Sequence, residues 1–300
     1  MNNRKSVLYL LGLVLVFASA AAATDYPRLT YKFTYPISLG QNTAPSGVND
    51  AGVVVGWYSD SLVGFHGFIL NGENVTTLDD PNATYEGGTL AYGVNSNPGS
   101  VLIAGSYQSS KTGNSVGFLY DAANETYTDI PGPSRAVNTY AEAINDSGVI
   151  VGSYSDSAGI YHGFLLKGKK YRTLDVPGAR GTIRTGINNK NNVVVQWSDS
   201  SGNIESSLYD VETGTFTTIN YPNAISSWAN GIDDAGDIVY TWEDSSGSVF
   251  GGVEHEGTFY QIPTPGEYAT GVNNKGEITG YYWAGNPFPA QMGFTLQVTE

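Results

Sequence analysis

Gly47-Val48-Asn49 is the first of six copies of one short motif, and the regular return of this motif predicts the fold. The later copies are Gly93-Val94-Asn95, Ala143-Ile144-Asn145, Gly186-Ile187-Asn188, Gly231-Ile232-Asp233 and Gly271-Val272-Asn273. Successive copies begin 46, 50, 43, 45 and 40 residues apart. A period of about 45 residues is typical of repeat architectures, in which each repeat is one structural unit.

The third repeat shows most clearly what one unit contains. Its extended segments are rich in β-branched and aromatic residues, and the segments between them are rich in Asn, Asp, Ser and Gly, which favour turns. The expected strands are Ala141 to Asn145, Val149 to Tyr154, His162 to Leu166 and Tyr171 to Val176, with Pro177 ending the last one. Four short antiparallel strands in about 45 residues are the size of a propeller blade.

The two ends of the chain distinguish a closed ring from an open solenoid. The sixth repeat stops after its third strand, Gly293 to Leu296, whereas Tyr31 to Pro36 resembles a fourth strand and precedes the first repeat. Pairing these two segments would leave no exposed edge, and a solenoid would need polar capping repeats that the sequence does not show. We therefore predict an all-β, six-bladed β-propeller of four-stranded antiparallel blades over residues 25–300, in which an N-terminal strand completes the last blade.

Residues 1–24 are typical of a cleaved secretory signal peptide. Arg4 and Lys5 precede an apolar run from Val7 to Ala18, and small residues from Ala18 to Ala23 offer A-x-A cleavage sites. The alternative is an uncleaved N-terminal anchor, although the run is short for a membrane span. We expect a secreted protein, either extracellular or periplasmic, that has no membrane span after cleavage.

Composition narrows the possible partners. The net charge is −14, and it approaches −16 once the two basic residues of the signal are removed. Nucleic acids and anionic membranes require a basic face, so neither is expected as a partner. The chain has no cysteine and therefore uses neither disulfides nor thiolate metal sites. We expect a monomer without a metal or other cofactor.

The tripeptides His66-Gly67-Phe68 and His162-Gly163-Phe164 carry a family resemblance. Together with the Gly/Ala-Val/Ile-Asn-Asp, Val-Val-Gly-x-Tyr and Thr-Leu-Asp-x-Pro segments, they resemble the bacterial extracellular repeat family named HAF after the tripeptide. The resemblance covers residues 31–296 and is weakest in repeats four and five, where Val195 and Tyr240 stand at the Gly position of the second strand. It implies a secreted or surface-exposed bacterial protein and no particular reaction.

Two sets of side chains raise the question of a metal. His66 and His162 are in phase whereas His255 is not, and three converging ligands of the kind that catalytic zinc needs are not evident. One aspartate recurs 13 residues after the motif, as Asp60, Asp156, Asp199 and Asp244. Calcium takes six to eight oxygen ligands, so Asx-turn geometry explains these aspartates better than a calcium site.

An aromatic residue recurs on the second strand of every repeat. The set is Tyr58, Tyr107, Tyr154, Trp197, Trp242 and Tyr282. These rings either form platforms for sugars or fill the same gap between neighbouring blades. A residue repeated with the scaffold favours core packing.

Functional residues are expected where the repeats differ, because what recurs is scaffold. In a propeller, the loops from strand four to the next strand one open on one face around the channel mouth. The candidate ligand-binding residues in these segments are Tyr85, Arg135, Tyr140, Glu142, Arg184, Trp228, Asn230 and Tyr268. Aromatic and arginine side chains are typical anchors of binding sites, and ordinary loop variation is the alternative explanation.

These observations predict a secreted, non-enzymatic protein that binds a glycan or an extracellular protein through one face of the propeller. The alternative is a secreted glycoside hydrolase or polysaccharide lyase with its site at the channel mouth, where Glu86 and Glu142 would act as an acid–base pair. The chain contains neither a G-x-S-x-G nor an H-E-x-x-H motif, which favours binding over catalysis.

Overall fold

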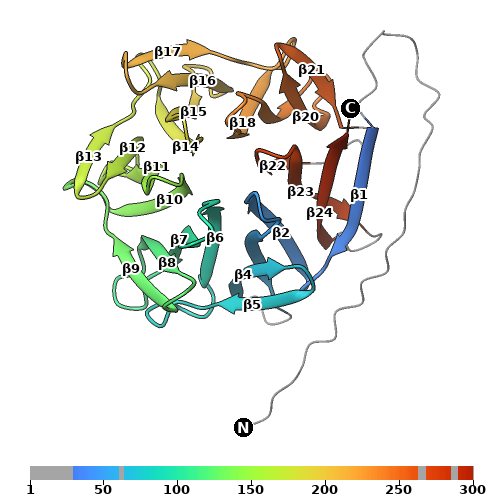
Figure 1. The fold of residues 1–300 in the computed structure, drawn as a ribbon. Helices are drawn as coiled ribbons and strands as arrows, with labels where there is room; N and C mark the ends of the chain where they lie inside the picture. The colour runs from blue at the N-terminus through green and yellow to red at the C-terminus, as the bar shows by residue number, and fades with distance from the viewer. Residues whose placement is uncertain (1–29, 61–63, 263–267, 285–289, 300) are drawn as a thin grey trace.

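Six blades surround a central channel in the computed structural model, which describes residues 30–60, 64–262, 268–284 and 290–299 (Figure 1). Each blade is a four-stranded antiparallel sheet, so the predicted architecture is confirmed. All regular elements of the described residues are β-strands. None of these residues forms a helix of the length and apolarity that crossing a membrane requires. The predicted signal peptide lies outside the described residues.

The first three blades are consecutive in sequence and run outward from the channel. They consist of β2 (Asn42–Val48), β3 (Val54–Ser59), β4 (Phe65–Asn71) and β5 (Asn74–Leu78); β6 (Thr89–Val94), β7 (Leu102–Gln108), β8 (Ser115–Asp121) and β9 (Thr126–Ile130); and β10 (Asn138–Ile144), β11 (Val149–Ser155), β12 (Tyr161–Lys167) and β13 (Lys170–Thr173). The strand β13 ends at Thr173 rather than at the predicted Val176, and beyond its end the Asp175 carboxylate contacts His162 and accepts a hydrogen bond from the Gly163 N–H.

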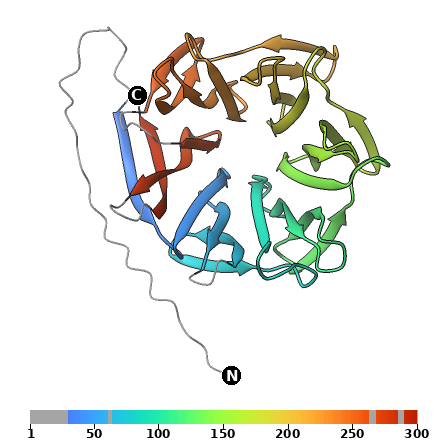
Figure 2. The same cartoon turned by 180° about the vertical axis from the view of Figure 1, so that it is seen from behind.

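The other three blades continue the same order. They consist of β14 (Gly181–Ile187), β15 (Asn192–Ser198), β16 (Ile204–Asp210) and β17 (Thr215–Thr218); β18 (Ser226–Ile232), β19 (Ile238–Glu243), β20 (Val249–His255) and β21 (Thr258–Gln261); and β22 (Tyr268–Val272), β23 (Glu277–Ala284) and β24 (Ala290–Thr299), to which β1 (Thr30–Ile37) adds the outer strand. Thr30 pairs with Thr299 and Phe33 with Leu296, so the N-terminal strand closes the ring as predicted. Both views show β1 along the outer side of β24 (Figures 1 and 2).

The hydrophobic core lies between the blades. Each of the six interfaces has its own cluster of buried apolar side chains, among them one of Val55 with Ile103 and one of Val151 with Val193. The recurring second-strand aromatics belong to this packing: Tyr107, Tyr154 and Trp242 are buried, and the other three are half-buried. The core-packing interpretation of these rings is therefore confirmed.

The glycine of the second strand makes room for the phenylalanine opposite it. A Cβ on Gly56 would lie 2.8 Å from the Phe68 ring, and Gly56 is the cross-strand partner of Phe68. In the fifth blade the large and the small residue are exchanged: the second strand carries Tyr240, and the third strand carries Gly252 opposite it. Tyr240 is fully buried and donates its hydroxyl to the Ile219 carbonyl at 2.7 Å. The departure of this repeat from the first is thus a volume-conserving exchange.

The glycine of the repeated motif allows the innermost strands to approach one another. A Cβ on Gly47 would lie 2.8 Å from the Tyr92 carbonyl oxygen, and a Cβ on Gly271 would lie 2.9 Å from the Ser46 carbonyl oxygen. The motif glycine of the other three glycine-containing blades also faces the backbone of the next blade, whereas the third blade has Ala143 at this position; at the closest approaches a larger residue would push the two blades apart.

The residue after the motif links the six blades in a circle of hydrogen bonds. We call this set, at the hairpins between strands one and two, the Asx ring: Asp50, Ser96, Asp146, Asn189, Asp234 and Asn274. The backbone N–H of each member donates to a side-chain oxygen of the next, and the last returns to Asp50, over distances of 2.6 to 3.0 Å. These contacts supplement the strand pairing that closes the ring.

Candidate functional site

The antiparallel order gives the propeller two different faces. Asn42, Ser59 and Phe65 are neighbours in the ladder, so strand one begins where strands two and three are joined. We call this side, which also carries the loops from strand four to the next strand one, the mouth face. The opposite side carries the Asx ring and is called the Asx face. The predicted site loops therefore all lie on the mouth face.

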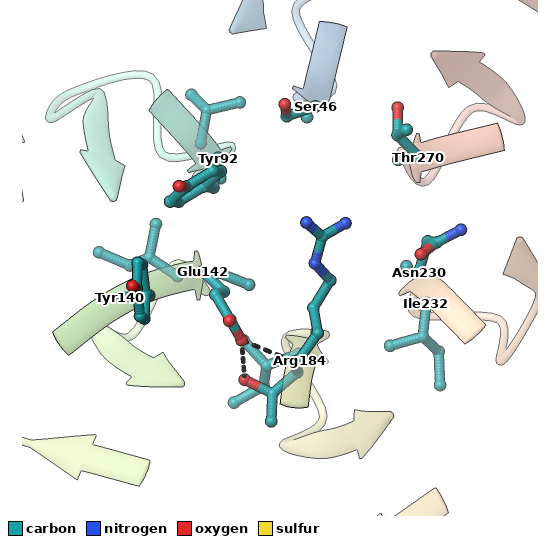
Figure 3. Close-up of a pocket in the computed structure, with 18 of the residues that line it drawn as sticks. Ser46, Tyr92, Tyr140, Glu142, Arg184, Asn230, Ile232 and Thr270 are labelled. Carbon is teal, nitrogen blue, oxygen red and sulfur yellow. Dashed lines mark hydrogen bonds between the residues drawn. The ribbon is translucent and has the colours of Figure 1, made fainter. Parts of the chain in front are cut away.

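A cavity of about 480 Å³ occupies the channel on the mouth side of the motif (Figure 3). Its floor is the aliphatic residue of the motif from each blade: Val48, Val94, Ile144, Ile187, Ile232 and Val272. The same six residues line a smaller pocket of about 60 Å³ against the Asx ring. This aliphatic ring separates the two spaces, so we expect a ligand to reach the larger cavity from the mouth face.

Five aromatic side chains line the cavity wall. They are Trp57, Tyr92, Tyr140, Tyr161 and Tyr281. The Tyr140 and Tyr161 rings stack with centroids 6.4 Å apart, and burial raises the pKa of Tyr92 to about 12. Tyrosine combines a flat apolar ring with a hydroxyl, so the wall offers both stacking surfaces and hydrogen-bonding groups.

A shift in strand register makes the fourth blade different from the others. In five blades the innermost strand has an irregularity at the residue just before the motif: Ser46, Tyr92, Glu142, Asn230 and Thr270. In the fourth blade the irregularity lies between Thr182 and Arg184, two residues earlier. Side chains of a strand alternate between the two faces of a sheet. An extra residue in one strand therefore changes the face on which each following side chain lies.

The shift turns Arg184 into the cavity. The corresponding residues of the other five blades are small and buried: Pro45, Ala91, Ala141, Ala229 and Ala269. Arg184 is exposed instead, and its side chain crosses the middle of the cavity (Figure 3). Within the described part of the chain, its guanidinium makes no hydrogen bond or ion pair, and it is the only cationic side chain of the cavity lining.

Glu142 is the acidic side chain of the lining, and its carboxylate is held against the wall. Oε1 accepts a hydrogen bond from Ser153 Oγ at 2.8 Å. Oε2 accepts from Thr185 N at 2.7 Å and from Thr185 Oγ1 at 3.1 Å. Burial raises the pKa of Glu142 to about 7, although the nearby Arg184 charge and these hydrogen bonds lower it. Glu142 can therefore gain or lose a proton near neutral pH.

Four of the eight predicted site residues meet in this cavity, namely Tyr140, Glu142, Arg184 and Asn230. Tyr268 lies behind the wall, where its ring stacks on Tyr281 at 4.7 Å. The other three, Tyr85, Arg135 and Trp228, are outside the lining. Tyr85 is exposed on the mouth face and donates its hydroxyl to Asp60 at 2.6 Å.

Sequence reasoning missed several cavity residues. Tyr92, Ser46 and Thr270 each stand directly before the motif of their repeat, as Glu142 and Asn230 do. Aligning the six repeats and comparing this position would have identified them. Tyr161 and Tyr281 come from the third and second strands of their blades, and no sequence signal places them beside the first strands.

The recurring aspartates form the predicted Asx turns. Asp156 Oδ1 accepts hydrogen bonds from the N–H groups of Ala158 and Ile160 at 2.8 and 3.0 Å, and Asp199 and Asp244 are arranged in the same way. Among the described residues, no group of three or more His, Cys, Asp or Glu side chains has the arrangement of a metal site.

Two in-phase histidines tie the mouth-face turns to the ends of the fourth strands. His66 Nδ1 is 2.7 Å from Asp79, and His162 Nδ1 is 2.9 Å from Asp175. On its other side, His162 Nε2 lies 3.5 Å from Asp156. Each ring also stacks on the preceding strand's tyrosine, Tyr58 or Tyr154. These contacts of His66 and His162 join neighbouring strands and turns, so the two histidines have a structural role.

Comparisons with known proteins agree with the fold. No family model matches the chain, and no curated protein matches it. TolB from Acinetobacter baumannii is similar, with a TM-score of 0.58 and 12% identity over 82% of this chain; the chain spans 63% of TolB. The β-propeller domain of the Trilobed protease from Pyrococcus furiosus has a TM-score of 0.53 and 11% identity, covering 86% of this chain and 82% of that domain.

A fucose-specific lectin from Aleuria aurantia is also similar. Its TM-score is 0.51 at 13% identity, covering 86% of this chain and 95% of the lectin. Identities this low show a common fold alone. The fold and the cavity together define the molecule as a six-bladed propeller with an open, polar and aromatic cup at one end of its channel.

Proposed function

We propose that this propeller is a binding protein that captures part of a glycan in the cavity on its mouth face. The observation that supports the proposal is the cavity lining, which combines five aromatic rings with hydroxyl, amide and charged groups among the described residues. A volume of about 480 Å³ lies within the range of small-molecule sites, about 300–1,000 Å³. It suits one or two sugar units better than a folded protein.

Exposed apolar side chains around the cavity support the mouth face as the binding surface. Of the seven exposed large hydrophobic residues in the described part of the chain, six lie on the mouth face: Tyr85, Val137, Ile160, Tyr161, Ile225 and Trp283. Because exposed apolar side chains gathered on one face are typical of interaction sites, a longer glycan has a surface to contact beyond the cup. The fucose-specific lectin of similar fold indicates that such a scaffold is compatible with saccharide binding.

A glycan array probed with the soluble protein tests the proposal. Ser46→Trp should fill the cavity and abolish binding, since Ser46 lines it and is half-buried. Ser200→Trp is the matched control, because Ser200 is exposed in the β15–β16 hairpin of the same face and does not line the cavity. Binding that survives Ser46→Trp, in a variant with an unchanged melting temperature, would place the site elsewhere.

One observation favours an enzyme as the second candidate. A carboxyl group with a pKa of about 7 can act as an acid or a base at neutral pH, and Glu142 lies in the cavity. Glu142 is nevertheless the only carboxylate of the described lining, whereas glycoside hydrolysis normally uses two. Release of new reducing or unsaturated ends from a bound glycan, abolished by Glu142→Gln, would favour the enzyme.

A further inference from the structure

The placement of Arg184 is not required by the propeller. Five blades build the same innermost strand with Ala or Pro at this position, and in each of them the residue is buried. Only the fourth blade combines a shifted irregularity with a long cationic side chain in the channel. The other five blades form the same innermost strand without an arginine in the channel. The stability of the propeller therefore does not explain the placement of Arg184.

The guanidinium is free to bind a ligand. Its five N–H donors have no acceptor among the described residues, and the side chain projects into the open cavity that aromatic rings also line. A guanidinium without a partner in the protein is available to an anionic ligand. A ligand that supplies this partner gains charge-assisted hydrogen bonds, which are stronger than neutral ones.

Glu142 does not take the role of that partner. Both of its oxygens already accept hydrogen bonds from Ser153 or Thr185. The two charges interact, but no ion pair within 4.0 Å joins Glu142 and Arg184. The carboxylate stays on the wall while the guanidinium projects into the open space (Figure 3).

We propose that the ligand is an acidic saccharide, and that Arg184 binds the carboxylate of a sugar acid such as a uronate. This inference rests on the proposed function and names the ligand class for the same cavity. The planar guanidinium fork matches the geometry of a carboxylate. Tyr92 and Tyr140 lie together on one side of the Arg184 side chain and provide rings for the sugar (Figure 3). One arginine in a chain of net charge −14 suits a single acidic unit better than a dense polyanion.

The test is an array of matched pairs, each an oligosaccharide that ends in a hexuronate or a neuraminate and the methyl ester of the same compound. The wild-type protein should retain the acids and lose about 10- to 100-fold in affinity for the esters, the range expected for hydrogen bonds to a charged group. Arg184→Ala should bind acid and ester equally weakly. Arg184→Lys, which keeps the charge without the fork, should restore part of the preference for the acid.

Arg180→Ala is the matched control, because Arg180 is exposed four residues earlier and outside the cavity lining. It should bind as the wild type does. Equal binding of acids and esters by the wild type, or unchanged binding of the acid by Arg184→Ala, would overturn the inference and leave the glycan proposal standing. Failure of the wild type to bind any saccharide on the array would overturn both.

Discussion

The backbone N–H of Asn274 donates to Asp50 Oδ1 at 2.9 Å, although the two residues are 224 positions apart. The Asn274 side chain adds a second bond to Asp50 Oδ2, also at 2.9 Å. This contact completes the Asx ring between the last blade and the first. The seam is therefore held at the outer edge by β1 on β24 and near the channel by this pair.

Asp50→Ala tests the inner part of the seam. It removes the acceptor for both bonds, and we expect a loss of about 1–2 kcal/mol in the free energy of unfolding. Amide hydrogen exchange should accelerate mainly in β2 and β22, which meet at the seam. Ser96→Ala, which removes one acceptor between the first two blades, is the control. Equal effects of the two variants on β22 would contradict a special role for the seam.

Gly47→Ala tests why the motif begins with glycine. The new Cβ would meet the Tyr92 carbonyl oxygen at 2.8 Å, and backbone atoms cannot move aside without parting two blades. We expect a destabilisation of about 1–3 kcal/mol, measured by denaturant unfolding. Gly99→Ala is the control, since its Cβ would meet only Asn97 Oδ1 at 3.6 Å. Similar stabilities for both variants would show that the approach of the inner strands is not critical.

Glu142 should make stability depend on pH in a definite direction. Its pKa rises from 4.5 to about 7 on folding, so the native state holds a proton that the unfolded state releases in this window. The free energy of unfolding should therefore fall as the pH rises from 4.5 to 7, by about 1–3 kcal/mol. Glu142→Gln mimics the protonated group and should lack this decrease. A wild-type-minus-variant difference that is constant with pH would contradict the prediction.

His162 should contribute a pH dependence of the same sign, but at higher pH. Burial lowers its pKa, but the carboxylates of Asp175 and Asp156 outweigh burial and raise it above 6.5. Its contribution is then fully present below pH 6.5 and is lost as the pH rises through the folded-state pKa. Because the ring is partly exposed, we expect less than about 1 kcal/mol. The loss of melting temperature caused by His162→Gln should be larger at pH 5.5 than at pH 9, and that caused by Asp175→Asn should have the same pH profile.

The repeated motif explains why so much of the fold was predictable. Gly47 sets the distance between inner strands, Val48 belongs to the aliphatic ring, and Asn49 forms the hairpin turn and donates to the Asn95 carbonyl at 3.0 Å. The aliphatic residue recurs in every blade and the glycine in five of the six, so the motif leaves a periodic signal and its six copies revealed the number of blades. The unpaired segment before the first repeat revealed the closing strand.

The candidate site was only partly predictable. Tyr140, Glu142, Arg184 and Asn230 lie in the variable segments before the motif, and they meet because the innermost strands all border the channel. Tyr85 and Arg135 lie in equally variable loops but outside the cavity, and no local pattern separates the two groups. Tyr161 and Tyr281 belong to the third and second strands of their blades, and the distance of these strands from the channel depends on blade twist and packing.

From the residues alone came the six-bladed ring, the order of the strands within a blade and the closure by the N-terminal strand. These features follow from periodicity, which a linear sequence displays directly. The direction of Arg184 depended on the folded sheet, because the irregularity between Thr182 and Arg184 reverses the sides on which the following residues lie. Strand register is a property of two paired segments and their neighbours, so neither segment by itself specifies that an arginine stands in the channel.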